Sequence, residues 1–189
     1  MHTDPITARE SESRDHLLSL MAAREIQHLP VIDPKGCLVG LETINKLARP
    51  TTRDNWVVLM AGGLGTRLRP LTQACPKPLL TVGSKPILEV ILENFIEQGF
   101  NRFFLSVNYK KQMIQDYFGD GSRWGVAIRY LEEDGRLGTA GPLSLLPEQP
   151  KKPIFVMNGD LLTRINFNQI LKFHKEHEAL ATLCVRRIE

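Results

Sequence analysis

The sequence predicts an α/β protein: a mostly parallel sheet with helices on both faces, preceded by a small α+β unit. From about residue 54, apolar strand-like runs alternate with helix-like segments. The runs are continuously apolar, as in parallel strands that are buried on both faces. A polar joint, ARPTTRDN, separates them from the first fifty residues. We therefore expect a small unit at residues 1–50 and a larger domain at residues 54–189.

The composition is that of an ordinary soluble globular protein and disfavours nucleic acid as a partner. Of 189 residues, 42% are hydrophobic, and the net charge of +3 comes without a basic block. We therefore expect no nucleic-acid partner, although a phosphate site needs only two or three cations. The three cysteines form no C-x-x-C pair and predict buried thiols in a reducing compartment. Because no leader or membrane-spanning run occurs, we expect a cytoplasmic protein with no membrane partner.

The first fifty residues predict a helix followed by a hairpin. ESESRDHLLSLMAARE carries leucines and a methionine on a helical period, and Ser11 or Ser13 can cap this helix. HLPVID and CLVGLETI are strand-like and are joined by the turn PKG. A unit this small buries little apolar surface, so we expect it to dock against something.

Residues 3–48 resemble one CBS motif, and LPVID…G…VG is the recognisable core. The family's module runs strand-helix-strand-strand-helix and usually works in pairs, which implies a homo-oligomer formed through this unit. In that family a Thr or Ser, followed three residues later by Asp, holds the ribose of an adenine nucleotide. Thr43 matches, but Lys46 replaces the Asp and cannot accept hydrogen bonds from ribose hydroxyls. We therefore expect a structural or dimerising role rather than ligand sensing.

The larger part predicts strands and helices in alternation. Trp56–Ala61 is an apolar strand, and KPILEVILENFIEQG is a helix that ends at Gly99, with Glu89, Glu93 and Glu97 on its polar face. There follow strand RFFLSVN, helix KKQMIQDYF, strand VAIRYLE, a short helix at 143–146, strand PIFVMNGD, helix NFNQILKFHKEH and strand ALATLCV. Ligands bind at the carboxyl ends of parallel strands, where AGGLGTR and NGD both fall.

The loop AGGLGTR indicates phosphate binding. Gly62, Gly63 and Gly65 allow a sharp turn that brings backbone N–H groups close to phosphate oxygens. No lysine follows the last glycine, which excludes a P-loop. The dinucleotide pattern G-x-G-x-x-G fails at Leu68, so a nicotinamide cofactor is disfavoured.

Two cations near this loop distinguish a ligand site from a purely structural turn. Arg67 can donate two parallel hydrogen bonds to phosphate oxygens. Lys77 lies between Pro76 and Pro78, which restrict the backbone on both sides of the lysine. Together they favour a highly anionic ligand such as a nucleoside triphosphate.

VLMAGGLGTRLRPLTQACPKPLLTVGSKPILE resembles the signature of the sugar-1-phosphate nucleotidylyltransferases in nearly every position, and the resemblance spans residues 56–189. It implies a Rossmann-like, nucleotide-diphospho-sugar transferase fold. It also implies that a sugar 1-phosphate displaces pyrophosphate from a nucleoside triphosphate, without a protein nucleophile. A CBS motif ahead of the transferase also occurs among sugar guanylyltransferases, so GTP and a substrate like mannose 1-phosphate are favoured.

The resemblance also implies roles for individual residues. Arg67 grips the triphosphate, Lys77 contacts oxygens near the α-phosphorus, and Asp160 binds Mg²⁺. Gly138 contacts the base through its backbone, with Glu133 assisting. The expected nucleotide-binding residues are Ala61, Gly62, Gly63, Gly65, Thr66, Glu133 and Gly138.

Alternatives stay open at this stage. UTP or dTTP could replace GTP, because these transferases share the loop. A function of another class is a non-catalytic, nucleotide-binding regulatory module that associates through the CBS unit. The family's catalytic domain normally continues further and supplies much of the sugar pocket and a second metal-binding Asp. We therefore expect weak or absent turnover from these 189 residues alone.

Overall fold

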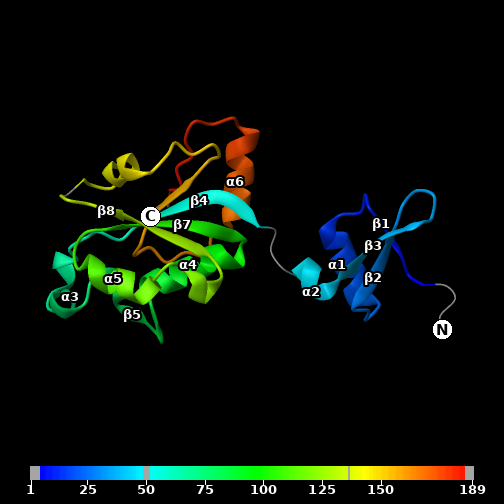
Figure 1. Ribbon diagram of the computed structural model, residues 1–189, viewed down its shortest axis with the longest axis horizontal. Coiled ribbons are helices and arrows are strands. Elements are labelled where there is room, and N and C mark those ends of the chain that lie inside the picture. The colour runs from blue at the N-terminus through cyan, green and yellow to red at the C-terminus, as the bar shows by residue number, and fades with distance from the viewer. Residues whose placement is uncertain (1–4, 49–51, 136, 186–189) are drawn as a thin grey trace. The chain divides into compact units, whose positions relative to one another are not determined.

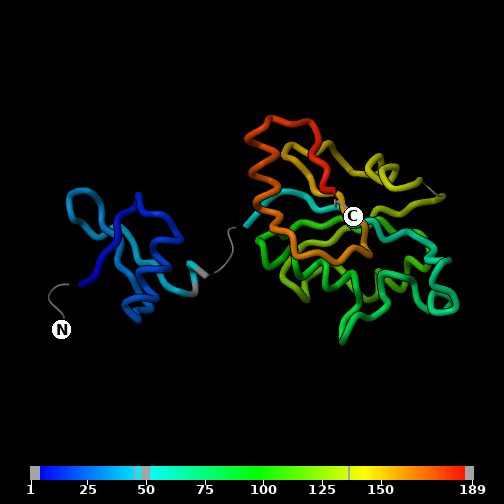
Figure 2. Tube along the Cα trace, turned by 180° about the vertical axis from the view of Figure 1, so that it is seen from behind, coloured from blue at the N-terminus to red at the C-terminus, as the bar shows by residue number. Residues whose placement is uncertain are grey.

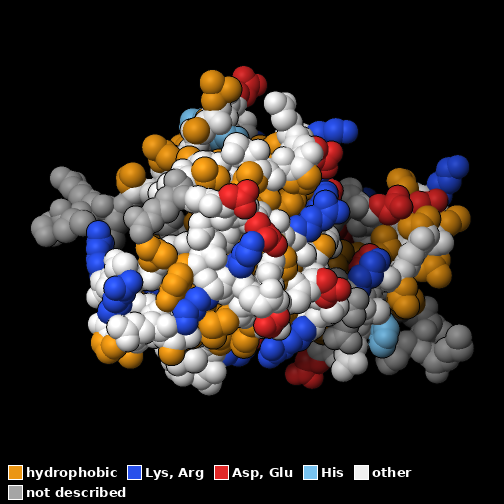
Figure 3. Space-filling view, turned by 60° about the vertical axis from the view of Figure 1, so that its left-hand side comes forward, with side chains coloured by type: hydrophobic (Ala, Val, Ile, Leu, Met, Phe, Trp, Pro, Cys, Tyr) orange, Lys and Arg blue, Asp and Glu red, His pale blue; other side chains and the backbone are white. Residues whose placement is uncertain are grey.

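The computed structural model describes residues 5–48, 52–135 and 137–185. The chain divides into two compact units, Met1–Thr51 and Thr52–Glu189, and each has its own apolar core (Figure 1). In the part of the chain that the structure describes, no helix combines the length and the apolar character needed to cross a membrane. Basic and acidic side chains are mixed over the face in Figure 3.

The first unit has the element order expected from the CBS resemblance. Its three-stranded sheet has the order β1-β2-β3, in which β1 is parallel to β2 and the hairpin β2–β3 is antiparallel. The Ser13 hydroxyl accepts a hydrogen bond from the His16 backbone N–H and caps α1, as the sequence predicts. The elements are β1 (Ala8–Arg9), α1 (Arg14–Ala23), β2 (His28–Ile32), β3 (Leu38–Thr43) and α2 (Ile44–Ala48).

The second unit contains a four-stranded sheet of order β8-β7-β4-β9 in which every neighbouring pair is parallel. All four carboxyl ends therefore lie at one edge of the sheet. Its strands are β4 (Arg53–Met60), β7 (Phe100–Val107), β8 (Ala127–Glu132) and β9 (Phe155–Asn158), and a separate two-stranded ribbon consists of β5 (Thr81–Val82) and β6 (Lys85–Pro86).

Helical segments of two kinds complete this unit. Figure 2 views them from the opposite side. The α-helices are α3 (Leu71–Ala74), α4 (Ile87–Glu97), α5 (Lys111–Phe118) and α6 (Phe167–Glu176), and the 3₁₀ segments are η1 (Thr66–Leu68), η2 (Lys77–Leu79), η3 (Ser122–Trp124) and η4 (Gly141–Leu145).

The two faces of this sheet are covered unequally. Along β4, Val57 and Leu59 join the larger core, to which α4, α5 and α6 all contribute side chains. Trp56 and Val58 join the smaller core on the other face, where η4 contributes Leu143. Strand β4 is therefore buried on both sides, which is why its sequence is continuously apolar.

The structure overturns two expectations about individual segments. ALATLCV does not form a strand: within the described residues this segment pairs with no strand, and Leu180, Leu183 and Val185 are 85–104% exposed. Strand propensity alone does not make a segment a β-strand, because its backbone hydrogen bonds need a neighbouring strand. Glu89 was expected on a polar face but is buried, and the Tyr117 hydroxyl compensates its lost hydration by donating to the carboxylate at 2.5 Å.

The cysteines also differ from expectation. All three are free thiols, but Cys37 and Cys184 are exposed and Cys75 is only half-buried. Cys37 lies between the turn and β3, and Cys184 lies in the segment that pairs with no described strand. The prediction of buried thiols was therefore wrong, because neither segment is covered by packed side chains in its own unit.

Candidate active site

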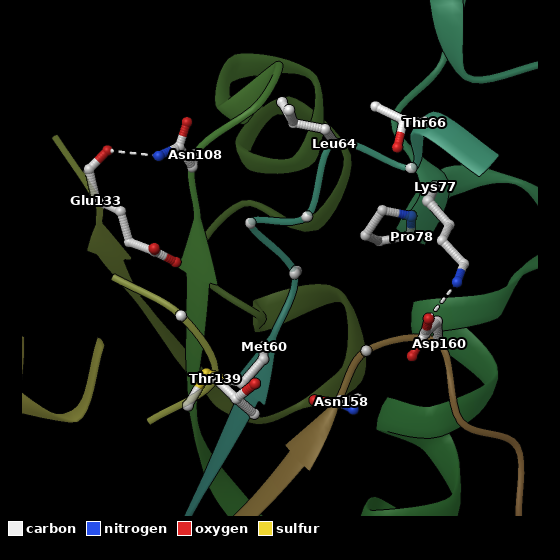
Figure 4. A pocket seen from close by; sticks show the side chains of 16 residues that line it. Met60, Leu64, Thr66, Lys77, Pro78, Asn108, Glu133, Thr139, Asn158 and Asp160 are labelled. Carbon is white, nitrogen blue, oxygen red and sulfur yellow. Dashed lines mark hydrogen bonds and ion pairs between the residues drawn. The ribbon is translucent and has the colours of Figure 1, made fainter. Parts of the chain in front are cut away.

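A cleft of about 480 Å³ opens at the carboxyl ends of the strands in the second unit (Figure 4). Each strand supplies the segment that follows it, as the parallel topology requires. The lining comes from residues 60–66 at and after the end of β4, Lys77 and Pro78 in η2, Asn108 after β7, Glu133 with 138–139 after β8, and 158–160 at and after the end of β9.

The cleft brings together almost all of the residues that the sequence singles out. Lys77, Glu133, Gly138 and Asp160 line it, together with the loop positions Ala61, Gly62, Gly63, Gly65 and Thr66. Arg67 does not line it: the side chain is exposed on η1. Its role at the triphosphate therefore stays a prediction.

Two of the loop glycines leave little space for a side chain. Gly65 has φ +63° and ψ 24°, a left-handed conformation that favours glycine, and a Cβ there would lie 2.8 Å from the Thr72 Cγ2. A Cβ at Gly62 would lie 2.6 Å from the Glu133 Oε1. The loop conformation therefore depends on glycine at position 65, whereas a side chain at position 62 would displace the Glu133 carboxylate.

Strands β4 and β9 carry the loop and Asp160 to neighbouring positions. Met60 is paired with Asn158, and the Gly159 backbone N–H donates to the Met60 carbonyl at 2.8 Å. Lys77 projects from η2 and forms an ion pair with Asp160 on one side of the cleft (Figure 4). Both side chains are 35% exposed, so the pair remains accessible to a ligand.

The opposite side of the cleft is organised around Glu133. The buried Ser106 hydroxyl donates to its carboxylate. The Asn108 side-chain amide donates to the backbone carbonyls of Glu133 at 3.2 Å and Gly135 at 3.0 Å. The neighbouring Glu132 is outside the lining, and a hydrogen bond from Lys111 lowers the pKa of its carboxyl.

Sequence reasoning missed Ser106, Asn108 and Asn158. A signal for the last two was present, because Asn108 ends the strand-like segment RFFLSVN and Asn158 begins NGD, which was expected at the cleft. Ser106 carries no comparable signal: it is a fully buried strand residue, and its role depends on the pairing of β7 with β8.

The cleft offers two carboxylates, Asp160 and Glu133, to a cation. Among the described residues, no group of three or more His, Cys, Asp or Glu side chains could hold a metal ion by themselves. This arrangement suits a hard cation that takes one or two protein carboxylates and completes its coordination with phosphate oxygens and water.

Comparison with protein families agrees with this architecture. Residues 56–189 match the family described as nucleotidyl transferase, and residues 1–41 match the CBS domain. A probable mannose-1-phosphate guanylyltransferase 1 of Oryza sativa subsp. japonica is 36% identical over 137 residues, and the mannose-1-phosphate guanylyltransferase catalytic subunit beta of Drosophila pseudoobscura pseudoobscura is 38% identical over 137 residues. These matches cover 70% of this chain but only 37–38% of each relative.

Solved structures share the fold of the second unit. HddC from Yersinia pseudotuberculosis, complexed with GMP-PN, has a TM-score of 0.56 at 29% identity, covering 64% of this chain and 54% of that one. A putative glucose-1-phosphate thymidylyltransferase from Bacillus anthracis has a TM-score of 0.58 at 22% identity, covering 64% and 50%. With residues 56–189 matched and the expected cleft in place, the chain belongs to the nucleotidyl transferase family and carries a CBS domain at its N-terminus.

Proposed function

We propose that the second unit binds a nucleoside triphosphate in this cleft and transfers its nucleoside monophosphate to a sugar 1-phosphate, releasing pyrophosphate. GTP and a substrate like mannose 1-phosphate are the favoured pair. The observation that carries the proposal is the convergence of the glycine loop, Lys77 and Asp160 in one cleft. The names of the curated relatives support the same reaction.

The proposed reaction is a single in-line displacement. A phosphate oxygen of the sugar 1-phosphate forms a bond to the α-phosphorus, and the bond from that phosphorus to the bridging oxygen of pyrophosphate breaks. No protein nucleophile takes part, so catalysis depends on alignment and on stabilising charge on the phosphates. Backbone N–H groups of the glycine loop, Lys77 and Arg67 are the proposed donors to phosphate oxygens.

Asp160 is the proposed protein ligand for Mg²⁺. When bound, the cation would neutralise phosphate charge and orient the phosphate oxygens. The residues fit this role because one accessible carboxylate lies in the cleft beside the cationic Lys77. The ion pair also gives the carboxylate a counter-charge when no cation is bound.

Glu133 supports guanine over the alternative bases. An ionised carboxylate only accepts hydrogen bonds, and its two oxygens match the adjacent N1–H and N2–H₂ donors of guanine. Uracil and thymine present one donor between two carbonyl oxygens, which a carboxylate would repel. The serine that holds this carboxylate, Ser106, is fully buried, so the acceptor is held in place. The complex of HddC with GMP-PN is consistent with this preference.

For the CBS unit we propose self-association rather than nucleotide sensing. Thr43 accepts a hydrogen bond from the Lys46 backbone N–H at 3.1 Å, and the Lys46 ammonium pairs with Glu42 at 2.6 Å. Both side chains are thus engaged within the unit. Strand β3 exposes Leu38, Val39 and Leu41 by 49–70%, which offers an apolar surface to a second copy. Light scattering of Leu41→Lys beside the wild type tests this: a purely monomeric wild type would contradict it.

The experiment for the transferase proposal measures binding and then turnover. Calorimetry with GTP, UTP and dTTP, each with Mg²⁺, should give the tightest binding for GTP. Pyrophosphate release is then measured over these triphosphates and a panel of sugar 1-phosphates, with Asp160→Ala and Arg67→Ala as variants. Identical background release from wild type and both variants, together with retained GTP binding, would favour a non-catalytic module. Absence of any triphosphate binding would overturn the proposal as a whole.

A further inference from the structure

The turn Asn108–Tyr109–Lys110, between β7 and α5, contacts the backbone of Glu133 at the cleft and, on its other side, helix α3. We call the glycine loop with Lys77 the phosphate wall, and Glu133 with Gly138 and Thr139 the base wall. We propose that the three residues of this turn are positioning residues that fix the two walls relative to each other for a nucleotide. This inference rests on the proposed function, and it adds residues that the motifs did not indicate.

On the phosphate side, the turn holds the short helix α3. The Lys110 ammonium donates to the carbonyls of Gln73 at 2.6 Å and Ala74 at 2.9 Å. These carbonyls lie at the end of the helix, where no intrahelical partner exists, so the lysine acts as a cap. The Tyr109 hydroxyl donates to the Thr72 carbonyl at 3.3 Å.

Helix α3 in turn sets the glycine loop. The Thr72 side chain is 1% exposed, and its hydroxyl donates to the Gly65 carbonyl at 2.9 Å. Contact between Thr72 and the Gly65 backbone is so close that a Cβ at Gly65 would overlap the threonine methyl. A shift of α3 would therefore move Gly65 and the N–H groups next to it.

On the base side, Asn108 holds the backbone that carries Glu133. Its amide nitrogen donates to the carbonyls of Glu133 and Gly135, the first of which Figure 4 shows as a dashed line. The Asn108 Cβ also lies 3.3 Å from where a Cβ of Gly62 would be. The turn therefore contacts the base wall directly and lies beside the glycine loop.

The backbone of Lys110 supports a positioning role. Its φ of 51° and ψ of 38° place it in the left-handed region, which lysine rarely adopts. Such conformations persist where the surrounding contacts over-determine them, as the two hydrogen bonds to α3 do here. With this conformation, Asn108 holds the base wall and Lys110, two residues further on, holds helix α3, which supports the phosphate wall.

Calorimetry with three probes tests the inference: GTP with Mg²⁺, inorganic tripolyphosphate with Mg²⁺, and GMP. Lys110→Met should weaken GTP and tripolyphosphate about tenfold and leave GMP close to wild type, because it releases only the phosphate wall. Asn108→Ala should weaken GTP and GMP by a similar factor and leave tripolyphosphate unchanged. Tyr109→Phe should weaken the same two probes as Lys110→Met, GTP and tripolyphosphate, but by a smaller factor.

Two further variants separate positioning from general loss of structure. Lys110→Arg should restore most of the affinity, because a guanidinium can also donate to two carbonyls. Lys152→Met is the matched control, since that ammonium pairs with Asp54 outside the cleft and should leave all three affinities unchanged. Thermal unfolding of each variant checks that it is folded.

The outcomes are distinct. Equal weakening of all three probes by a folded variant, or wild-type affinities in Lys110→Met and Asn108→Ala, would overturn the inference alone. A wild-type chain that binds none of the probes would overturn the proposed function and this inference with it. Selective weakening, with rescue by arginine, supports both.

Discussion

The two walls of the cleft present different chemical groups to a ligand: mainly backbone on one wall and a side-chain carboxylate on the other. The phosphate wall consists of backbone at three glycines and one cation, Lys77, which is paired with Asp160. The base wall presents a carboxylate, Glu133, that a buried hydroxyl holds in place. A wall made of backbone suits phosphate, which every nucleotide carries, whereas a side-chain acceptor distinguishes one base from another. Changes to the phosphate wall should therefore weaken all nucleoside triphosphates, and changes to the base wall should alter selectivity.

The largest effect is expected from Lys77, the cation of the phosphate wall. Lys77→Met should weaken GTP and inorganic tripolyphosphate alike, by about 10- to 100-fold, because a charged donor to phosphate is lost. Pyrophosphate release should fall further, since the charge on the transferring group grows in the transition state. Calorimetry and a pyrophosphate assay measure the two effects.

Lys85→Met is the matched control for that variant. The Lys85 ammonium pairs with Glu93 at 2.6 Å and lies outside the cleft lining, so its loss should change neither affinity nor rate. If Lys77→Met bound tripolyphosphate as tightly as Lys85→Met does, the assignment of the phosphate wall would be wrong.

The next effect concerns Gly159, which directly follows β9 and lies against the end of β4. A Cβ at Gly159 would lie 2.9 Å from the Met60 carbonyl oxygen, so Gly159→Ala must displace backbone beside Asp160. We expect a loss of about 1–3 kcal/mol in the free energy of unfolding, typical of overpacking. Urea unfolding measures it.

Gly63→Ala is the control variant with which the stability of Gly159→Ala is compared. An added methyl there meets no atom within 4 Å, so the free energy of unfolding should change by less than about 0.5 kcal/mol. Equal stability of the two variants would contradict the close approach of β9 to β4 at Gly159.

Much of the fold could be predicted from the sequence, because its strands and helices have strong local signals. The continuously apolar runs predicted a parallel sheet, and parallel strands placed AGGLGTR and NGD at one edge. The burial of Glu89 could not be predicted in this way. It depends on the hydroxyl of Tyr117, which is 28 residues away in sequence and reaches the carboxylate only in the folded protein.

In the site, too, features with a local sequence signal could be predicted, and features that depend on contacts between distant segments could not. The glycines of the phosphate wall form a motif that is visible in sequence, and at Gly65 the left-handed backbone and the close approach of Thr72 restrict the residue type. Ser106 lies inside β7 and Asn108 directly follows this strand, and their contacts with Glu133 depend on the register in which Val107 pairs with Glu132. Register is a property of the assembled sheet, so Ser106 could not be selected from sequence alone, and for Asn108 only its place at the end of a strand was visible.

Glu133→Gln sharpens the comparison by changing the base wall alone. Glutamine presents one acceptor and one donor group, which matches the N3–H and neighbouring carbonyl of uracil better than the two donors of guanine. The ratio of UTP to GTP dissociation constants should fall about tenfold, and tripolyphosphate binding should not change. Glu132→Gln, an exposed neighbour paired with Lys111, is the control and should leave the ratio as it is. An unchanged ratio in Glu133→Gln would show that the base is read elsewhere.

The smallest effect is expected from Ser106→Ala, which keeps the Glu133 carboxylate but removes the hydroxyl that orients it. Because Glu133 is only partly buried, water can replace the lost donor, and GTP affinity should fall by only about three- to fivefold. As in Glu133→Gln, the affinity for GTP should fall and the affinity for tripolyphosphate should not change. Ser144→Ala removes a hydroxyl that donates to Gly141 on η4, outside the lining, and should have no effect on either ligand. If Ser106→Ala instead weakened tripolyphosphate as much as GTP, the walls would not be separable, and the cleft would respond as one structural unit.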